Sequence, residues 1–323
     1  MTVHPSAMGG TGPIYAVGTI GFDFGTQARR DSIGEEMHLA QIRGNPDDPV
    51  QLRRLLRFRP WLVDKVIWVL KVDRIALYAL EPERAHRGNW QEFVAGEVSQ
   101  VLSTLARAID GQAAPASSDS YVSRVSLAGW LTTRTARLIS GQVLPVVEVA
   151  ARRIDLWLEN VIVDSAVSAF LEDPRLAQRT GVDVRDTADS VVRAVLNKTY
   201  AELRNGGHTP ADRALNFLGT GLVHASRFFK EPLFAGWELD DVPASHELAS
   251  ESLNLYTLGR VVVSRSPVGS LYSDSWDVTL VFFDPRAPQR AKACYVFTVD
   301  VRDQLPVLRP HYHRFISSSR FAC

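Results

Sequence analysis

The stretch WDVTLVFFDP at residues 276–285 decides the fold class, because its apolar side chains recur at every second position. A period of two is typical of a strand with one buried face. The residues predicted to face the core are Trp276, Val278, Leu280 and Phe282. A second alternating run, Tyr295, Phe297 and Val299, follows a turn at residues 286–292. The two runs therefore predict an antiparallel strand pair.

Further elements are predicted on both sides of this pair. Helical spacing or capping residues occur at residues 27–42, 48–59, 89–109, 155–171, 186–204 and 210–229. Strand patterns occur at residues 13–24, 66–80 (a hairpin turning at Asp73-Arg74), 121–131, 135–138, 143–150 and 255–264. Strands and helices do not alternate regularly, so the sequence predicts an α+β fold with mixed or antiparallel sheets and packed helices.

The chain of 323 residues is long enough for two subdomains. The segment DGQAAPASSDS at residues 110–120 is small, polar and contains proline, which is typical of a boundary. The predicted order is a flexible tail (1–12), an N-terminal α+β subdomain (13–110), a linker (111–120), a C-terminal α+β subdomain (121–308) and a second tail (309–323).

Composition excludes several classes of protein. Lys and Arg together number 36, as do Asp and Glu, which argues against a nucleic-acid partner. The most apolar stretch, residues 61–72, contains three charged residues, so no membrane span or membrane partner is expected. The start of the chain does not resemble a signal peptide. The two cysteines, Cys294 and Cys323, are too few for a disulfide framework, so a cytoplasmic location is expected.

The motifs of serine proteases and nucleotide-binding loops are missing. The sequence contains no His-Gly, no Gly-Thr-Ser and no Gly-x-Ser-x-Gly, so a serine protease is excluded. No Gly-Lys dipeptide is present, so there is no P-loop, and no cofactor is expected. His311 and His313 share one face of an extended segment, and Cys323 reaches them if the tail folds back. Because these three lack a fourth ligand, no metal is expected.

Acidic residues provide a candidate catalytic set. Asp277 and Asp300 interrupt apolar runs, so once buried they would need partners such as Arg213 or Arg137. Asp23 lies between two phenylalanines in a glycine-flanked turn, where a carboxylate can have a raised pKa. The simpler interpretation is that Asp23 caps the following helix. The candidate catalytic residues are Asp23, Arg29, Arg30, Asp277 and Asp300.

The segment RRLLRFRPW at residues 53–61 is a basic helix with interleaved aromatic residues. One interpretation is a docking face for an acidic peptide or protein, formed by Arg53, Arg54, Arg57, Arg59 and Trp61. The other is a solvated helix face that turns Leu55, Leu56 and Phe58 inward.

Six ordered blocks carry a family resemblance: YAVGTIGFDFGTQARRDS (15–32), VLKVDRIALYALEP (69–82), SGQVLPVV (140–147), ELRNGGHTPADRALNF (202–217), WDVTLVFFDP (276–285) and YVFTVDVRDQLPV (295–307). They resemble the C-terminal domain of unknown function of the cyanobactin maturation proteases of the PatA/PatG type, here free-standing and without the subtilisin-like protease. Gly269 and Ser275 stand where the family has two cysteines, so a family metal site is not carried over.

The resemblance implies a pathway, the maturation of a ribosomally synthesised and post-translationally modified peptide (RiPP), without assigning catalytic residues. We therefore expect a non-catalytic accessory or recognition protein that binds the precursor peptide or a RiPP-modifying enzyme. The alternative is a peptide-modifying enzyme that uses the carboxylate and arginine set above. A homodimer is left open.

Overall fold

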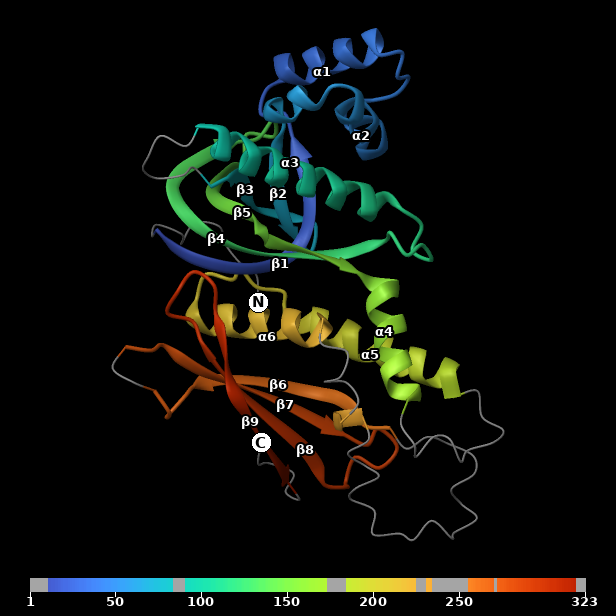
Figure 1. The fold of residues 1–323 in the computed structure, drawn as a ribbon, viewed down its shortest axis with the longest axis vertical. Coiled ribbons are helices and arrows are strands. Elements are labelled where there is room, and N and C mark those ends of the chain that lie inside the picture. The colour runs from blue at the N-terminus through green and yellow to red at the C-terminus, as the bar shows by residue number, and fades with distance from the viewer. Residues whose placement is uncertain are drawn as a thin grey trace. The chain divides into compact units, whose positions relative to one another are not determined.

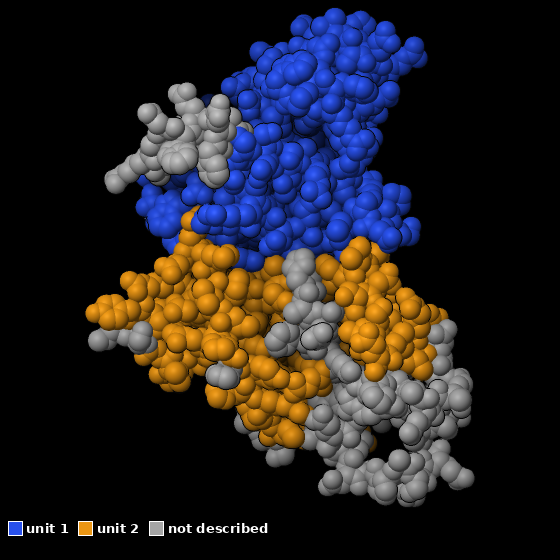
Figure 2. All heavy atoms as spheres, viewed as in Figure 1, with its two compact units in different colours: residues 1–159, 204–209 blue, residues 160–203, 210–323 orange. Residues whose placement is uncertain are grey.

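The computed structural model describes residues 11–83, 91–172, 184–224, 231–233, 255–269 and 272–317. They form an α+β protein with one mixed and one antiparallel sheet, as the sequence predicts. The chain divides into two compact units, shown in separate colours in Figure 2. Unit 1 comprises residues 1–159 and 204–209, and unit 2 comprises residues 160–203 and 210–323.

Unit 1 is built on a closed barrel with the strand order β1-β2-β3-β5-β4 (Figure 1). The strands are β1 (Gly12–Asp23), β2 (Ile67–Val72), β3 (Ile75–Pro82), β4 (Val122–Arg137) and β5 (Val143–Leu158). β3 and β5 are parallel, and the other neighbours are antiparallel. The predicted hairpin is confirmed, since Asp73 and Arg74 both take the positive φ angles of a two-residue turn between β2 and β3.

Helices complete the core of unit 1. They are α1 (Gln27–Leu39), α2 (Pro49–Phe58), the 3₁₀ helix η2 (Pro60–Lys65) and α3 (Gln91–Ala113). Thr26 caps α1 by accepting a hydrogen bond from the Arg29 N–H, and Asp48 caps α2 in the same way. In Figure 1 α3 runs across the barrel strands, and its buried face, including Val101 and Leu105, joins the barrel core.

β4 and β5 are longer than predicted. The sequence indicates short strands up to residue 150 and a helix from residue 155, but β5 continues to Leu158 and the helix begins at Glu159. Residues 154–158 pair with β4, and Trp157 is fully buried with its Nε1 donating to the Ser126 hydroxyl at 3.2 Å. Pairing with β4 and burial of Trp157 therefore determine the conformation of residues 154–158, although the spacing of their apolar residues is helical.

Unit 2 packs helices on a four-stranded antiparallel sheet of order β6-β7-β8-β9. The elements are α4 (Glu159–Leu171), α5 (Val184–Glu202), α6 (Pro210–His224), β6 (Thr257–Arg265), β7 (Ser275–Phe283), β8 (Lys292–Asp300) and β9 (Val307–Ser317). α5 contacts β6, and α6 contacts β6, β7 and β8 (Figure 1). The predicted pairing of β7 with β8 is confirmed, with Leu280 opposite Tyr295 and Phe282 opposite Ala293.

Two predicted boundaries are wrong. The linker at residues 111–120 lies inside unit 1, because α3 continues to Ala113 and residues 114–121 form successive turns that lead into β4. Gly111 packs so closely on Val122 that an added Cβ would lie 2.3 Å from its side chain. The predicted tail at residues 309–323 is in strand β9 as far as Ser317, and residues 318–323 lie outside the described part. Of the tail at residues 1–12, residues 1–10 also lie outside it.

Residues 204–209 return from unit 2 to the barrel of unit 1. The Tyr15 N–H donates to the Gly207 carbonyl at 2.9 Å, and the Tyr78 hydroxyl donates to the Gly206 carbonyl at 2.6 Å. Gly207 has a φ of +67°, and a Cβ there would lie 2.1 Å from the Tyr15 oxygen. Gly207 of the ELRNGGHTPADRALNF block is therefore required by the fold.

Candidate functional site

The five candidate catalytic residues belong to different units. Asp23, Arg29 and Arg30 lie at the end of β1 and on α1 in unit 1, whereas Asp277 and Asp300 lie on β7 and β8 in unit 2. Neither unit therefore contains the whole predicted set.

In unit 2 the two aspartates hold strands and turns. The Asp277 carboxylate accepts a hydrogen bond from the Thr298 hydroxyl at 2.7 Å, across the β7–β8 pair. The Asp300 carboxylate accepts from the Asp274 N–H at 3.2 Å and lies 3.5 Å from Arg309. Arg213 and Arg137 were expected as partners if the two aspartates were buried, but both aspartates are only partly buried, and their contacts are with Thr298 and Arg309 instead.

Arg213 on α6 binds main-chain carbonyl groups rather than either aspartate. It is only 4% exposed, and its guanidinium donates to the backbone carbonyls of Val301 and Asp303 at the end of β8. Burial lowers the pKa of Arg213 to about 10, against the opposing charges of Asp274 and Asp303. The guanidinium is still charged at neutral pH, and it ties α6 to the end of the sheet.

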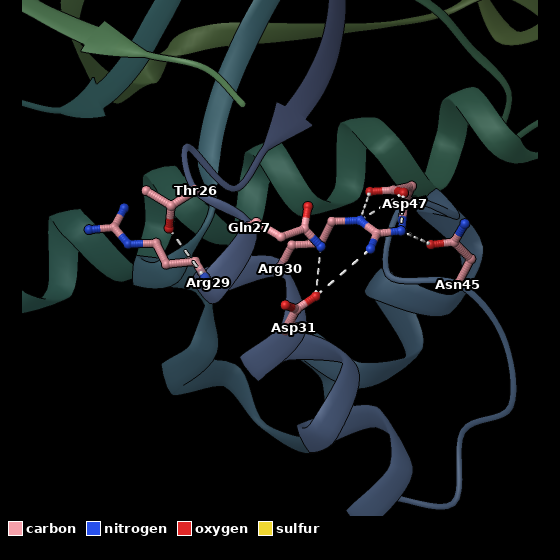
Figure 3. Close-up of polar contacts among 7 residues, drawn as sticks. All are labelled: Thr26, Gln27, Arg29, Arg30, Asp31, Asn45 and Asp47. Atoms are coloured by element: carbon pink, nitrogen blue, oxygen red, sulfur yellow. Dashed lines mark hydrogen bonds and ion pairs between the residues drawn. The ribbon is translucent and has the colours of Figure 1, made fainter. Parts of the chain in front are cut away.

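In unit 1 an arginine clamp joins α1 to the loop before α2 (Figure 3). Arg30 binds Asp47 through Nε and Nη2, with distances of 3.0 and 2.7 Å to Asp47 Oδ2, and also donates to the Asn45 side-chain oxygen at 3.0 Å. The hydrogen bond and charge of Asp47 raise the pKa of Arg30. Arg29 points away from this cluster. The clamp fixes the loop and leaves Arg30 occupied.

Asp23 fixes the end of β1. Its Oδ1 accepts hydrogen bonds from the Gly25 N–H at 2.6 Å and from the Ile139 N–H at 2.9 Å. Ile139 lies in the turn between β4 and β5. The interpretation of Asp23 as the cap of α1 is wrong, because Thr26 takes that position. Asp23 instead connects two neighbouring loops of the barrel.

A cavity of about 320 Å³ opens beside Asp23, and we call it the Asp23 cavity. Its walls come from the end of β1 and the residue after it (20–24), the end of α3, Asp47 and Pro49 before and at the start of α2, Lys71 of β2, and Ile139. Of the predicted catalytic residues only Asp23 lines it, so the structure does not assemble the predicted carboxylate and arginine site. Lys71 and Gln112 also line the cavity, and neither was predicted from the sequence.

In the basic segment at residues 53–61, some side chains form ion pairs with neighbouring helices and others are exposed to solvent. Arg53 and Arg57 both pair with Asp110 of α3, and Arg59 pairs with Glu36 of α1. Leu55 and Leu56 are buried as predicted, but Phe58 is 66% exposed, so its predicted inward orientation is wrong. Trp61 is 64% exposed, and Arg54 is exposed as well.

Between α2 with η2 and α3 lies a groove of about 260 Å³, which we call the α2–α3 groove. Its floor is apolar, with Leu56, Val63, Leu102 and Ala106. Its charged residues are three arginines, Arg53, Arg57 and Arg107, and one carboxylate, Asp110. The groove therefore carries a net positive charge. Arg107 was not predicted, because it lies on α3, about fifty residues from the basic segment.

The candidate metal ligands do not form a described site. His313 is exposed on β9, the His311 side chain is not described, and Cys323 lies outside the described residues. Within the described ranges, no group of three His, Cys, Asp or Glu side chains could hold a metal ion. Cys294 is fully buried in β8. Among the described helices, none combines the length and hydrophobicity needed to cross a bilayer.

Together the fold and these surfaces define a class: an α+β protein of two units, with a barrel that carries two open concave surfaces. The sequence pattern of the PatG domain matches residues 13–144, and that of the PatG C-terminal region matches residues 183–315. A solved structure titled "PatG Domain of Unknown Function" is similar, with 31% identity, a TM-score of 0.74, and coverage of 94% of this chain and 99% of that one. No curated protein sequence matches. The chain belongs to the PatG family.

Proposed function

We propose that the chain is a recognition protein in cyanobactin-type peptide maturation, and that it binds an acidic segment of the precursor peptide or of a partner enzyme in the α2–α3 groove. The observation that carries the proposal is the groove itself, an apolar floor with three arginines and one aspartate on its walls. Family membership supports the pathway, since PatG-type proteins act in that maturation.

The charges of the groove favour an acidic ligand. Asp110 is already shared between Arg53 and Arg57. The Arg57 guanidinium lies 3.2 Å from the Asp110 carboxylate, and the Arg57 side chain is 65% exposed. Arg107 is exposed and has no ion pair with any described residue. A carboxylate entering the groove would therefore meet guanidinium groups that bind it with two parallel hydrogen bonds.

Exposed aromatic residues beside these arginines add to the argument. Phe58 ends α2 and Trp61 lies in η2, the two elements that provide one wall of the groove. Exposed aromatic residues and arginines are the residue types that contribute most binding energy in protein interfaces. An acidic segment with an apolar residue for the floor and a second for Trp61 fits this surface.

Reversing the charges of two exposed arginines of the groove should strongly weaken binding of an acidic probe. The probe is a fluorescein-labelled, 20-residue amphipathic peptide rich in Glu and Leu, and binding is measured by fluorescence anisotropy at low and at physiological salt. Arg57→Glu with Arg107→Glu should weaken binding by about a hundredfold, because each reversal replaces an attraction with a repulsion of roughly 1–2 kcal/mol.

The matched control reverses Arg43 and Arg74, which are exposed in the same unit but do not line the groove. It changes the net charge equally and should keep wild-type affinity apart from a small general electrostatic effect. Equal losses in the two double variants would show that the probe responds only to net charge. A probe with Lys in place of Glu should not bind.

The alternative, a peptide-modifying enzyme, would use the carboxylate and arginine set. Its members lie in two units and make structural contacts, which favours the binding proposal over it. We expect no peptidase activity, because the motifs of a catalytic triad are missing from the sequence. A fluorogenic peptide library should show no turnover, and a serine-directed phosphonate probe should leave the protein unlabelled. Stoichiometric labelling of a serine would contradict this.

A further inference from the structure

Strand β1 has an open edge near its end. It pairs with β4 only from Gly12 to Gly18, whereas its pairing with β2 continues from Thr19 to Asp23. After Gly18, therefore, the side of β1 that faces β4 lacks a strand partner in the described chain. Sheet edges of this kind are sites where an extended peptide can add as a further strand.

A side chain already imitates such a strand at the first open position. Gln112 of α3 donates from Nε2 to the Ile20 carbonyl at 2.7 Å, and its Oε1 accepts from the Ile20 N–H at 2.8 Å. A primary amide in this orientation presents the same donor and acceptor as the peptide group of a neighbouring strand. The main-chain N–H and C=O of Ile20 therefore both have hydrogen-bond partners. The first main-chain groups open to a ligand are those of the next residue that points to this side.

The next pair belongs to Phe22. In an antiparallel ladder the N–H and C=O of alternate residues point to the same side. Because the N–H and C=O of Ile20 point away from β2 toward Gln112, those of Phe22 also point away from β2. The described chain places no strand and no side-chain hydrogen bond on the Phe22 main chain at this side.

The Asp23 cavity, of about 320 Å³, lies directly along this edge. Residues 20–24 form one of its walls, with Gln112 and Ala113 from α3 and Pro49 from α2 on other walls. Its volume is at the lower end of the range for ligand pockets, roughly 300–1,000 Å³, which suits two or three peptide residues.

Lys71 provides a charge in the same cavity. Its side chain lies against Gly21, where an added Cβ would be 2.6 Å from the ammonium nitrogen. No ion pair joins Lys71 to another described residue. The two carboxylates of the cavity are otherwise engaged: Arg30 neutralises Asp47, and Asp23 accepts hydrogen bonds from two backbone N–H groups. Lys71 is thus the cation left for a ligand.

We infer that this edge binds an extended peptide segment, with one peptide residue hydrogen-bonded to the Phe22 main chain and a peptide carboxylate paired with Lys71. The site shares no lining residue with the α2–α3 groove. A failure of one site therefore leaves the other unaffected, and the two are tested separately.

Three tetrapeptides test the inference: acetyl-Val-Thr-Val-Ala with a free C-terminus, its amide, and acetyl-Val-Thr-Val-Glu amide. Binding to the full chain is followed through the Phe22 amide resonance in two-dimensional NMR, at peptide concentrations up to millimolar. At least one of the two carboxylate-bearing peptides should shift this resonance, and the neutral amide should bind about tenfold more weakly. Comparison of the first and third peptides tells a C-terminal carboxylate from a side-chain one.

The main-chain contact is tested on the ligand, which avoids any effect on folding. Two N-methylated versions of the tighter-binding peptide are compared. In one, the methyl groups replace the N–H hydrogens that would point toward β1, and in the other they replace the N–H hydrogens of the opposite edge. One version should lose binding and the other should keep it. Equal affinities would overturn the strand pairing.

The charge contact is tested with Lys71→Met, which keeps the length of the side chain. It should weaken binding of the carboxylate peptide about tenfold and leave the neutral amide unchanged. The control is Lys65→Met, at an exposed lysine of η2 outside the cavity, which should bind as the wild type does. No binding of any peptide to the wild type, or equal effects of the two lysine variants, would overturn the inference.

Discussion

Phe282→Ala should lower the melting temperature sharply or leave the protein insoluble. Phe282 is 3% exposed on β7 and packs edge-on against Tyr295 of β8, with ring centroids 5.9 Å apart. Truncating a buried phenylalanine typically costs about 3–5 kcal/mol, because apolar burial is lost and a cavity remains. This is a large share of a total stability of roughly 5–15 kcal/mol. Thermal unfolding followed by circular dichroism measures the effect.

The control is Phe58→Ala, the same substitution at a phenylalanine that is 66% exposed. It should change stability by less than about 0.5 kcal/mol, as surface substitutions usually do. If Phe282→Ala instead melted like the wild type and lost partner binding, β7 would face a ligand rather than the core.

Arg213→Met should produce the second largest loss. The methionine keeps much of the side-chain volume but removes the donors that Val301 and Asp303 receive at the end of β8. The buried Val301 carbonyl would then be unsatisfied, at a cost of about 1–3 kcal/mol, and the Asp303 carbonyl would lose a partly buried, charge-assisted hydrogen bond. Chemical denaturation should therefore show a loss of roughly 2–4 kcal/mol.

Two further variants make this result specific. Arg213→Lys should recover little, since an ammonium cannot reach both carbonyls as a planar guanidinium does. Arg286→Met, at an exposed arginine in the turn after β7, should be nearly neutral. Equal stability of the Arg213 and Arg286 variants would show that Arg213 does not hold the end of the sheet.

The pKa of Arg213 determines the sign of a pH effect. Burial lowers its pKa from the ordinary arginine value, which holds in the unfolded chain, to about 10 in the folded protein. Between these values the unfolded state binds more protons, so the contribution of this group to stability rises with pH. Below pH about 10 both states are protonated and the contribution is constant. The Arg213→Met loss should therefore not vary with pH between 5 and 8.

The sequence predicted the β7–β8 pair because each strand is a single uninterrupted alternation. It did not predict the length of β4 and β5, because their pairing shifts register at three places, such as between Leu127 and Gly129. Each shift breaks the period of two, so long strands read as short runs. The linker predicted at residues 111–120 was wrong because a polar segment that contains proline is typical of turns within a domain as well as of linkers between domains.

Of the candidate sites, the basic helix was predicted because its charges are consecutive in sequence. Arg107 and Asp110, which complete the groove, come from α3 and meet it only after folding. The Asp23 cavity could not be predicted, because its polar groups come from separate elements. Gln112 was also unpredictable, since a glutamine that pairs with a strand edge has the same sequence context as one exposed to water.

The central claim, recognition of an acidic segment at the α2–α3 groove, is tested most directly by amide hydrogen exchange with and without the Glu-rich probe peptide. Bound probe should slow exchange in α2, in η2 and along residues 99–110 of α3. Arg57→Glu with Arg107→Glu should remove that protection, while the Arg43 and Arg74 control should keep it. Protection confined to other elements, or unchanged in the groove variant, would contradict the assignment of the groove as the binding site.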